Sequence, residues 1–162
     1  MVLICMSYPL HGLGLRQLYT SYGDLSAVPA ARRQGDWRAV FIGPWWLRLL
    51  AAPSIAVSGM PGWFGKRFAN PESAVNLLRS AKGLREVLSM RCEEQPSWND
   101  GRPCSVLVYA SKARMPWRWV RDELRQLDEQ HWLCMTYVDL PLLRALGCPF
   151  MLVRDDAASN AG

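Results

Sequence analysis

The stretch LREVLSMRCEEQPSWNDGRPCSVLVY, residues 84–109, decides the fold class. Every second residue from Leu88 to Cys92 is apolar, and polar side chains occupy most of the positions between them, as on a strand with one wet face. Asn99-Asp100-Gly101 is a turn signal, because glycine supplies the positive φ that tight turns need. A valine-rich run follows at residues 104–109. The stretch therefore predicts a β-hairpin.

Similar runs recur along the chain, and turn-rich segments separate them. An amphipathic helix is expected over residues 15–23, because leucines and tyrosines recur there at helical spacing. Five further strands are expected, over residues 36–43, 75–79, 117–127, 132–140 and 149–155. For residues 117–127 a helix is the competing interpretation. About seven hairpin-linked strands after one helix predict a mainly β fold, an antiparallel meander closing into a lipocalin-like barrel.

The length and composition predict one globular domain. The chain has 162 residues, half of them apolar and a fifth charged. The barrel domain is expected to cover residues 13–154. Residues 1–12 and 155–162 are expected to be disordered ends.

A second stretch, FIGPWWLRLLAAPSIAVSGMPGWF at residues 41–64, is long enough to cross a bilayer. Its three prolines break the continuous helix that a span requires. A short helix is expected from Pro44 to Ala52, where Pro53 stops it, followed by a Gly/Pro connector that returns the chain at Lys66. Residues 44–64 are therefore interpreted as an insertion after the first strand, either a lid over an apolar pocket or an interfacial helix.

The net charge of +5 is placed unevenly: residues 1–81 carry eight basic and three acidic side chains. Arg38, Lys66 and Arg67 flank the apolar stretch, and a basic rim around an apolar patch suits an anionic headgroup or a fatty carboxylate. No nucleic-acid motif is present, and no Lys/Arg run is interleaved with aromatic residues. Nucleic acid is therefore not expected as a partner.

The five cysteines form no C-x-x-C motif, which is typical of a reducing compartment. The predicted localisation is the cytoplasm, with contact to the inner face of the membrane left open. His11 and His131 sit in no ligand spacing, so no metal and no cofactor are expected. No catalytic residue is assigned, because no G-x-S-x-G is present and His131 lies in a predicted polar turn.

Two short motifs resemble a known family. Gly35-Asp36-Trp37-Arg38 resembles the Gly-x-Trp opening of the uncharacterised bacterial GXWXG-type domains, with Ala39 in place of the second glycine. Trp63-Phe64-Gly65-Lys66-Arg67-Phe68 resembles the Trp-x-Gly-Lys-x-Phe segment of the same proteins, and residues 122–140 are similar to the closing strands of calycin-like, lipocalin-like barrels. The resemblance covers residues 35–154. It implies a small β-barrel with a tryptophan at its closed end, and it implies no activity.

Eight tryptophans are many for this length and suit a cavity lining. Trp37 is expected to plug the barrel floor, and three later tryptophans to face the pocket or its mouth. Asp122 and Glu123 are adjacent and must point to opposite faces of a strand, so whichever faces inward needs a partner. Arginines at 91, 121 and 125 are the candidates. The predicted ligand-binding residues are Trp37, Trp45, Trp46, Trp63, Lys66, Arg67, Trp119, Arg121, Asp122 and Glu123.

The leading functional hypothesis is a small soluble barrel that binds an apolar or amphipathic, lipid-like molecule, with residues 44–64 as its lid. One alternative is an enzyme acting on a hydrophobic substrate in the same barrel, with Asp122 or Glu123 and an arginine at its centre. Another is peripheral attachment to a membrane through residues 41–64. The ligand and the oligomeric state stay open.

Overall fold

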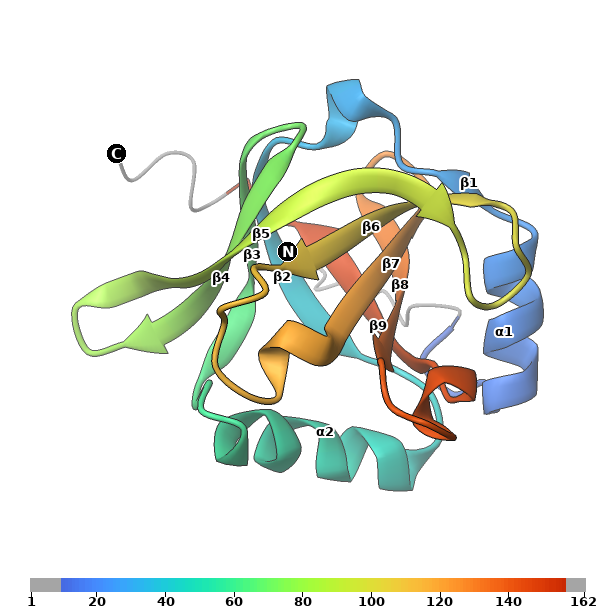
Figure 1. Ribbon diagram of the computed structural model, residues 1–162, viewed down its shortest axis with the longest axis horizontal. Helices are drawn as coiled ribbons and strands as arrows, with labels where there is room; N and C mark the ends of the chain where they lie inside the picture. The colour runs from blue at the N-terminus through green and yellow to red at the C-terminus, as the bar shows by residue number, and fades with distance from the viewer. Residues whose placement is uncertain (1–9, 157–162) are drawn as a thin grey trace, which may run out of the picture.

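The computed structural model describes residues 10–156, and within them the chain forms a closed, eight-stranded antiparallel barrel (Figure 1). Each barrel strand pairs with the next one along the chain, and β2 pairs with β9 from Trp37 opposite Arg154 to Phe41 opposite Phe150, which closes the ring. A two-residue strand, β1 (Ser26–Ala27), adds to β7 outside the ring. The barrel strands are β2 (Gly35–Phe41), β3 (Trp63–Asn70), β4 (Ser73–Ser80), β5 (Gly83–Pro96), β6 (Pro103–Tyr109), β7 (Val120–Gln126), β8 (His131–Val138) and β9 (Cys148–Arg154).

Two α-helices accompany the barrel. Helix α1 (Leu15–Gly23) lies against its side, and α2 (Trp45–Val57) follows β2 and crosses one end of it, at the bottom of Figure 1. Three single 3-10 turns are also present, η1 (Ala30–Arg32), η2 (Trp117–Trp119) and η3 (Leu143–Ala145). The predicted barrel, with an N-terminal helix and a short helix after the first strand, is confirmed.

Strand β3 is the element that the sequence pattern missed. The sequence predicts a turn-rich connector over residues 59–66, because this segment contains three glycines and a proline. In the structure Lys66 is 1 % exposed and faces the barrel interior, where the pattern would place an apolar residue. The glycines and the inward lysine therefore hide a strand that pairs with both β2 and β4 from a search for alternating apolar residues.

The predicted end of the lid helix at Pro53 is wrong, because α2 continues to Val57. The fixed φ of proline fits a helix. Pro53 has no amide hydrogen, so the carbonyl of Leu49 lacks the hydrogen bond that it would accept in a regular helix. Leu49 lies on the exposed side of the helix, where water can supply that bond. Over residues 117–127 the strand interpretation is confirmed from Val120 onward, and the first three residues form η2.

The apolar residues form two cores. One fills the barrel, and the other lies between its outer surface and α1. Strand β8 shows why two are needed: Trp132 and Cys134 point inward, while Leu133 and Met135 point outward and are covered, with Leu18 of α1 in the same outer cluster. A strand buried on both faces has a nearly continuous apolar sequence, and in WLCMTYV only Thr136 interrupts it.

Stacked tryptophans close the end of the barrel away from α2. Trp37 lies near the start of β2, the strand that runs toward the lid helix, and its ring stacks on Trp132 with centroids 3.6 Å apart. Phe68 meets Trp132 edge-on at 5.4 Å, and the indole nitrogen of Trp37 donates to the carbonyl of Gln34 at 3.0 Å. These packed aromatic rings therefore fill the floor of the barrel.

The terminal segments predicted as disordered fall largely outside the described residues, which begin at residue 10 and end at 156. Leu10 packs into the outer core. None of the helices in this part of the chain is both long and apolar enough to cross a membrane.

Candidate functional site

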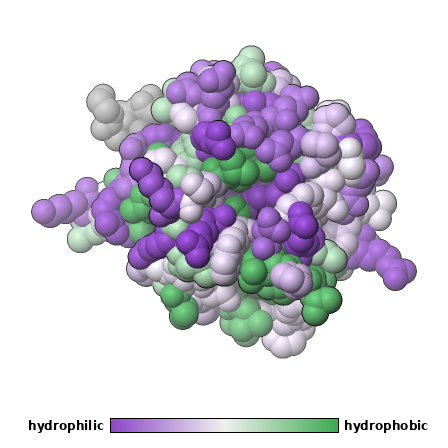
Figure 2. Space-filling view, viewed as in Figure 1, coloured by the Kyte–Doolittle hydropathy of each residue, from purple (hydrophilic) through white to green (hydrophobic). Residues whose placement is uncertain are grey.

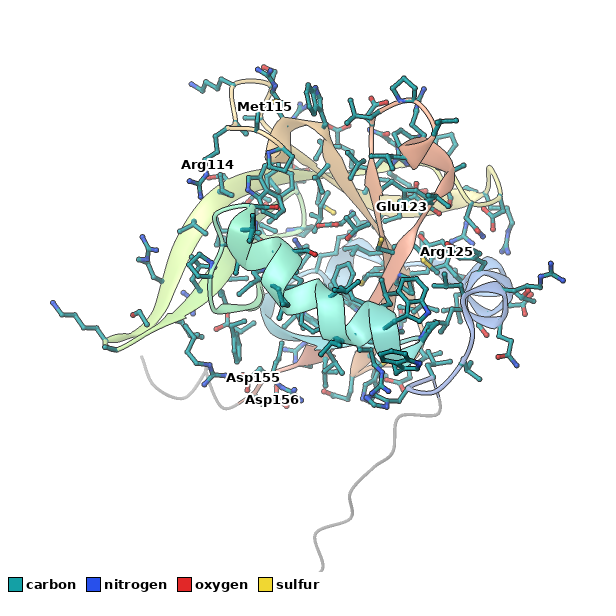
Figure 3. The ribbon with its side chains drawn as sticks, turned by 90° about the horizontal axis from the view of Figure 1, so that it is seen from below. Arg114, Met115, Glu123, Arg125, Asp155 and Asp156 are labelled. Carbon is teal, nitrogen blue, oxygen red and sulfur yellow. The ribbon has the colours of Figure 1, made fainter. Side chains whose placement is uncertain are left out.

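A cavity of about 280 Å³ lies between α2 and the inner end of the barrel. The helix contributes Leu47, Leu50, Ala51 and Ile55, and the barrel and η2 contribute mainly aromatic walls. Figure 3 looks onto α2 from this side, with the barrel behind it. Leu50 and Cys148 line the cavity and are also exposed, which places its mouth between the helix and the start of β9. The aromatic walls are Phe41, Trp63, Tyr109, Trp117 and Phe150.

A buried ion pair lies at the inner end of this cavity. The ammonium of Lys66 on β3 is 2.8 Å from Oδ2 of Asp122 on β7, and their side chains are 1 % and 5 % exposed. Lys66 also donates to Oδ1 of Asn76 at 3.0 Å and lies 3.5 Å from the sulfur of Met90. All three ammonium hydrogens therefore have partners within the protein.

Neighbouring strands extend the ion pair into a network. Asn76 on β4 accepts from the indole nitrogen of Trp63 at 3.0 Å and donates to the hydroxyl oxygen of Tyr109 at 2.9 Å. On the other side, the hydroxyl of Thr136 on β8 donates to Oδ1 of Asp122 at 2.6 Å. These residues come from five strands, β3, β4, β6, β7 and β8, so the network exists only because the barrel is closed.

The electrostatics of the network favour a charged Lys66 and a neutral Tyr109 at neutral pH. Burial disfavours the charged form of Lys66, but the charge and hydrogen bond of Asp122 outweigh it, and the pKa of Lys66 lies above its ordinary value. Burial raises the pKa of Tyr109, with the positive charge of Lys66 acting against it. Lys66 is thus a protonated cation with no free lone pair for nucleophilic attack, and Tyr109 is a neutral phenol.

The network presents no net charge to the cavity, since one cation faces one anion. Within residues 10–156 no group accepts the hydroxyl hydrogen of Tyr109, so this hydrogen is available to a guest molecule. The carboxylate of Asp122 keeps unused lone pairs after its bonds to Lys66 and Thr136. The polar end of the cavity therefore offers one neutral donor and one acceptor beneath apolar walls.

Three of the residues predicted as ligand contacts line this cavity: Trp63, Lys66 and Asp122. The inward carboxylate is Asp122, and its partner is Lys66 rather than any of the three candidate arginines. The reason is topological, because β3 lies across the barrel interior from β7 and is not its neighbour in the sheet.

Arg121 and Glu123 flank Asp122 on β7 and therefore point to the outer surface. They pair with each other at 2.8 Å under the loop that joins β5 to β6, where Ser97 donates to Glu123 at 2.5 Å. The guanidinium of Arg121 also lies 4.5 Å from the ring of Trp98. This pair anchors the loop and does not reach the cavity.

The remaining predicted contacts also lie away from the cavity. Trp37 is in the floor, and Arg67 is on the outer face, where it pairs with Asp36 at 2.6 Å and Glu86 at 2.8 Å. Trp45 and Trp46 are 70 % and 43 % exposed on α2 and do not line the cavity. Trp119 is half-buried beneath the guanidinium of Arg118.

The site also contains residues that the sequence reasoning missed: Asn76, Tyr109 and Thr136. Asn76 carried a usable signal, because it stands alone among apolar residues in the run Ala74-Val75-Asn76-Leu77-Leu78. A polar residue in a buried strand needs a partner inside the fold. Its partners come from other strands, and the sequence does not show which. No cluster of His, Cys, Asp or Glu in residues 10–156 could hold a metal ion.

No protein-family model and no curated protein matches this chain. Among solved structures, it is similar to a protein from Thermomonospora curvata, with a TM-score of 0.67 and 19 % identity over 90 % of each chain. At that identity the similarity establishes a shared fold, the closed eight-stranded antiparallel barrel, and nothing about activity.

Proposed function

We propose that this barrel binds an uncharged amphipathic small molecule, an alcohol, ketone or ester with a compact hydrocarbon body, in the cavity beneath α2. The observation that carries this proposal is the neutralised Lys66–Asp122 pair at the inner end of an apolar cavity. The interior of an eight-stranded barrel is wide enough to hold one small ligand, as in lipocalins.

The ion pair favours a neutral headgroup over a fatty carboxylate. An incoming carboxylate would be desolvated beside Asp122, and Lys66 has no unpaired hydrogen to offer it. A hydroxyl or carbonyl group can accept from Tyr109, and a hydroxyl can also donate to Asp122. The volume of about 280 Å³ is near the lower end for ligand pockets, which favours a medium-length chain.

Four probes of equal chain length test the headgroup: 1-decanol, 2-decanone, decanoate and decylammonium. Binding is followed by calorimetry and by the fluorescence of Trp63 and Trp117, which line the cavity. We expect the alcohol and the ketone to bind at least about 10-fold more tightly than either ion, because each ion loses its hydration and meets no unpaired charge of opposite sign. Equal affinity for decanoate would contradict the neutral headgroup, and no binding of any probe would contradict the function.

Tyr109→Phe removes the hydroxyl that we assign to ligand recognition. It should weaken the binding of 1-decanol and 2-decanone by about 5–10-fold, the usual effect of one lost hydrogen bond. Tyr137→Phe is the matched control, because Tyr137 is equally buried but belongs to the outer core. The Tyr137→Phe variant should bind both probes as tightly as the wild type. Equal losses of affinity in the two variants would disprove a role of the Tyr109 hydroxyl in ligand recognition.

Cys148 provides a second, independent test of where the ligand lies. It lines the cavity and is exposed, whereas Cys92, Cys104 and Cys134 are buried. In a Cys5→Ser background, saturating 1-decanol should slow the alkylation of Cys148 by N-ethylmaleimide several-fold. Burial raises the pKa of this thiol, so the reaction is best followed at mildly alkaline pH. Alkylation at an unchanged rate would place the ligand elsewhere, and Cys148→Ser gives the background signal.

A further inference from the structure

The exposed apolar side chains of this protein gather at one end of the barrel. Nine large hydrophobic residues are exposed in the described part of the chain, and all nine belong to α2, the 110–119 loop or the 139–147 loop. In Figure 2 green atoms mark the lower edge of the molecule, over α2 and the 139–147 loop. They are Trp45, Trp46, Leu49, Leu50, Val57, Met115, Leu142, Leu143 and Leu146.

These three segments lie at the same end of the barrel (Figure 1). The 110–119 loop contacts the C-terminal end of α2, where Arg114 donates to the carbonyl of Gly59 at 2.5 Å and the indole of Trp117 donates to that of Ser58 at 2.8 Å. Figure 3 shows Arg114 and Met115 beyond this end of the helix. At the other end, the 139–147 loop leads into Cys148, which lines the same cavity as α2. We call this surface the lid face.

Helix α2 is apolar on two sides, which an ordinary surface helix is not. One side, with Leu47, Ala51 and Ile55, lines the cavity. The opposite side carries Trp45, Leu49, Pro53 and Val57, each four residues after the last, and Val57 is 90 % exposed. No residue of the helix is buried. The second apolar side has no partner within residues 10–156.

The charge of the lid face is strongly positive. Its three segments carry five basic side chains, Arg48, Lys112, Arg114, Arg118 and Arg144, and one acidic one, Asp139, which pairs with Arg144 at 3.0 Å. These three segments therefore carry a formal charge of +4. Tryptophans beside apolar residues and basic side chains match the chemistry of a lipid–water interface with anionic headgroups.

We propose that the lid face docks onto an anionic lipid bilayer, with the outward side of α2 inserted among the headgroups. Two copies of the protein would meet with +4 on each side, which opposes self-association through this face. Docking does not depend on the proposed function. If both hold, a docked barrel would exchange its ligand with the bilayer, because the mouth of the cavity is at the lid face.

The test is vesicle co-sedimentation at about 0.1 M and 0.5 M NaCl. The vesicles are pure phosphatidylcholine, or phosphatidylcholine with a quarter of phosphatidylglycerol. We expect binding to the anionic vesicles that weakens at high salt and is at least about 10-fold weaker on the neutral ones. Equal binding to both vesicles, or to neither, would overturn the proposal.

Two variants separate the apolar and the charged contributions. Trp45→Ser/Leu49→Ser/Val57→Ser removes the outward stripe without touching the cavity lining, and Lys112→Glu/Arg118→Glu reverses two charges. Each should lower partitioning to anionic vesicles at least about 10-fold. The matched control, Arg16→Glu/Arg91→Glu, makes the same charge change outside the lid face. Its partitioning to anionic vesicles should fall far less. If both charge variants lose vesicle binding equally, net charge alone explains the binding, and a specific docking face is refuted.

The same variants distinguish this proposal from the proposed function. The stripe variant should bind 1-decanol in solution like the wild type, because none of its three residues lines the cavity. Loss of vesicle binding with intact 1-decanol binding supports docking. If sedimentation velocity instead shows a wild-type dimer that the stripe variant loses, and vesicles are not bound, the lid face is a protein interface and the proposal fails.

Discussion

Lys66→Met should destabilise the fold by about 3–5 kcal/mol, because it leaves the carboxylate of Asp122 buried without its cation. Methionine matches the length of the lysine stem, so the loss reports the charge and not a cavity. That is a large part of the total stability of a domain of this size. The measurement is the urea midpoint, interpreted with an unchanged slope.

The double variant Lys66→Met/Asp122→Leu is the control for this result. It removes both charges, and replacing a buried ion pair with apolar residues is commonly neutral or stabilising. We therefore expect the double variant to be clearly more stable than Lys66→Met alone, although Thr136 loses its acceptor. If the double variant is as unstable as the single one, the pair is not the reason for the loss.

Gly65→Ala should destabilise the fold by about 3 kcal/mol, at the upper end of the range for overpacking. A Cβ atom at this position would lie 2.0 Å from the carbonyl oxygen of Trp37 and 3.0 Å from both the amide nitrogen of Ala39 and the Cα atom of Arg38. These are backbone atoms of β2 and cannot rotate away, so β2 and β3 would have to separate. Thermal and urea unfolding measure the loss.

Gly12→Ala is the matched control for Gly65→Ala. A Cβ at Gly12 would meet no atom within 4 Å, so its effect should be within about 0.5 kcal/mol. A Gly65→Ala protein as stable as this control would show that the strands approach less closely than the structure has them.

Both large effects belong to one short segment of β3, Trp63 to Phe68. Its residues have separate physical roles: Trp63 lines the cavity, Gly65 allows β2 to approach, Lys66 supplies the buried cation, and Phe68 packs in the floor. This short segment therefore serves both the backbone, where β2 and β3 must approach closely, and the site, which needs a buried cation.

The sequence predicted the fold class well because strands and turns leave local signals. The alternation at residues 84–94, the turn at Asn99-Asp100-Gly101 and the apolar run at 132–138 correspond to β5, the loop after it and β8. The pattern failed at β3, where the inward residue is charged, and at Pro53, where an exposed helix tolerates a missing hydrogen bond. Both failures occur where the residues border the cavity or its lid.

The candidate site was predicted only in part. That Asp122 and Glu123 face opposite sides follows from the period of a strand, so the sequence alone required one buried carboxylate with a partner. It did not identify Lys66 as that partner, since the two residues are 56 positions apart and meet only across the closed barrel. The sequence also did not identify Asn76, Tyr109 and Thr136 as members of the site, because they too meet the ion pair only inside the closed barrel.

What the sequence by itself determined is the meander of strands, the helix before it, and an apolar, proline-containing insertion beside basic residues. Local spacing decides these features. Only the tertiary structure decided that the carboxylate of Asp122 meets Lys66, and that α2 turns one apolar side to the cavity while Trp45 and Leu49 stay exposed on the other. Side-chain alternation relates residues within one strand, whereas partners across a barrel depend on its closure and register, which form between distant parts of the chain.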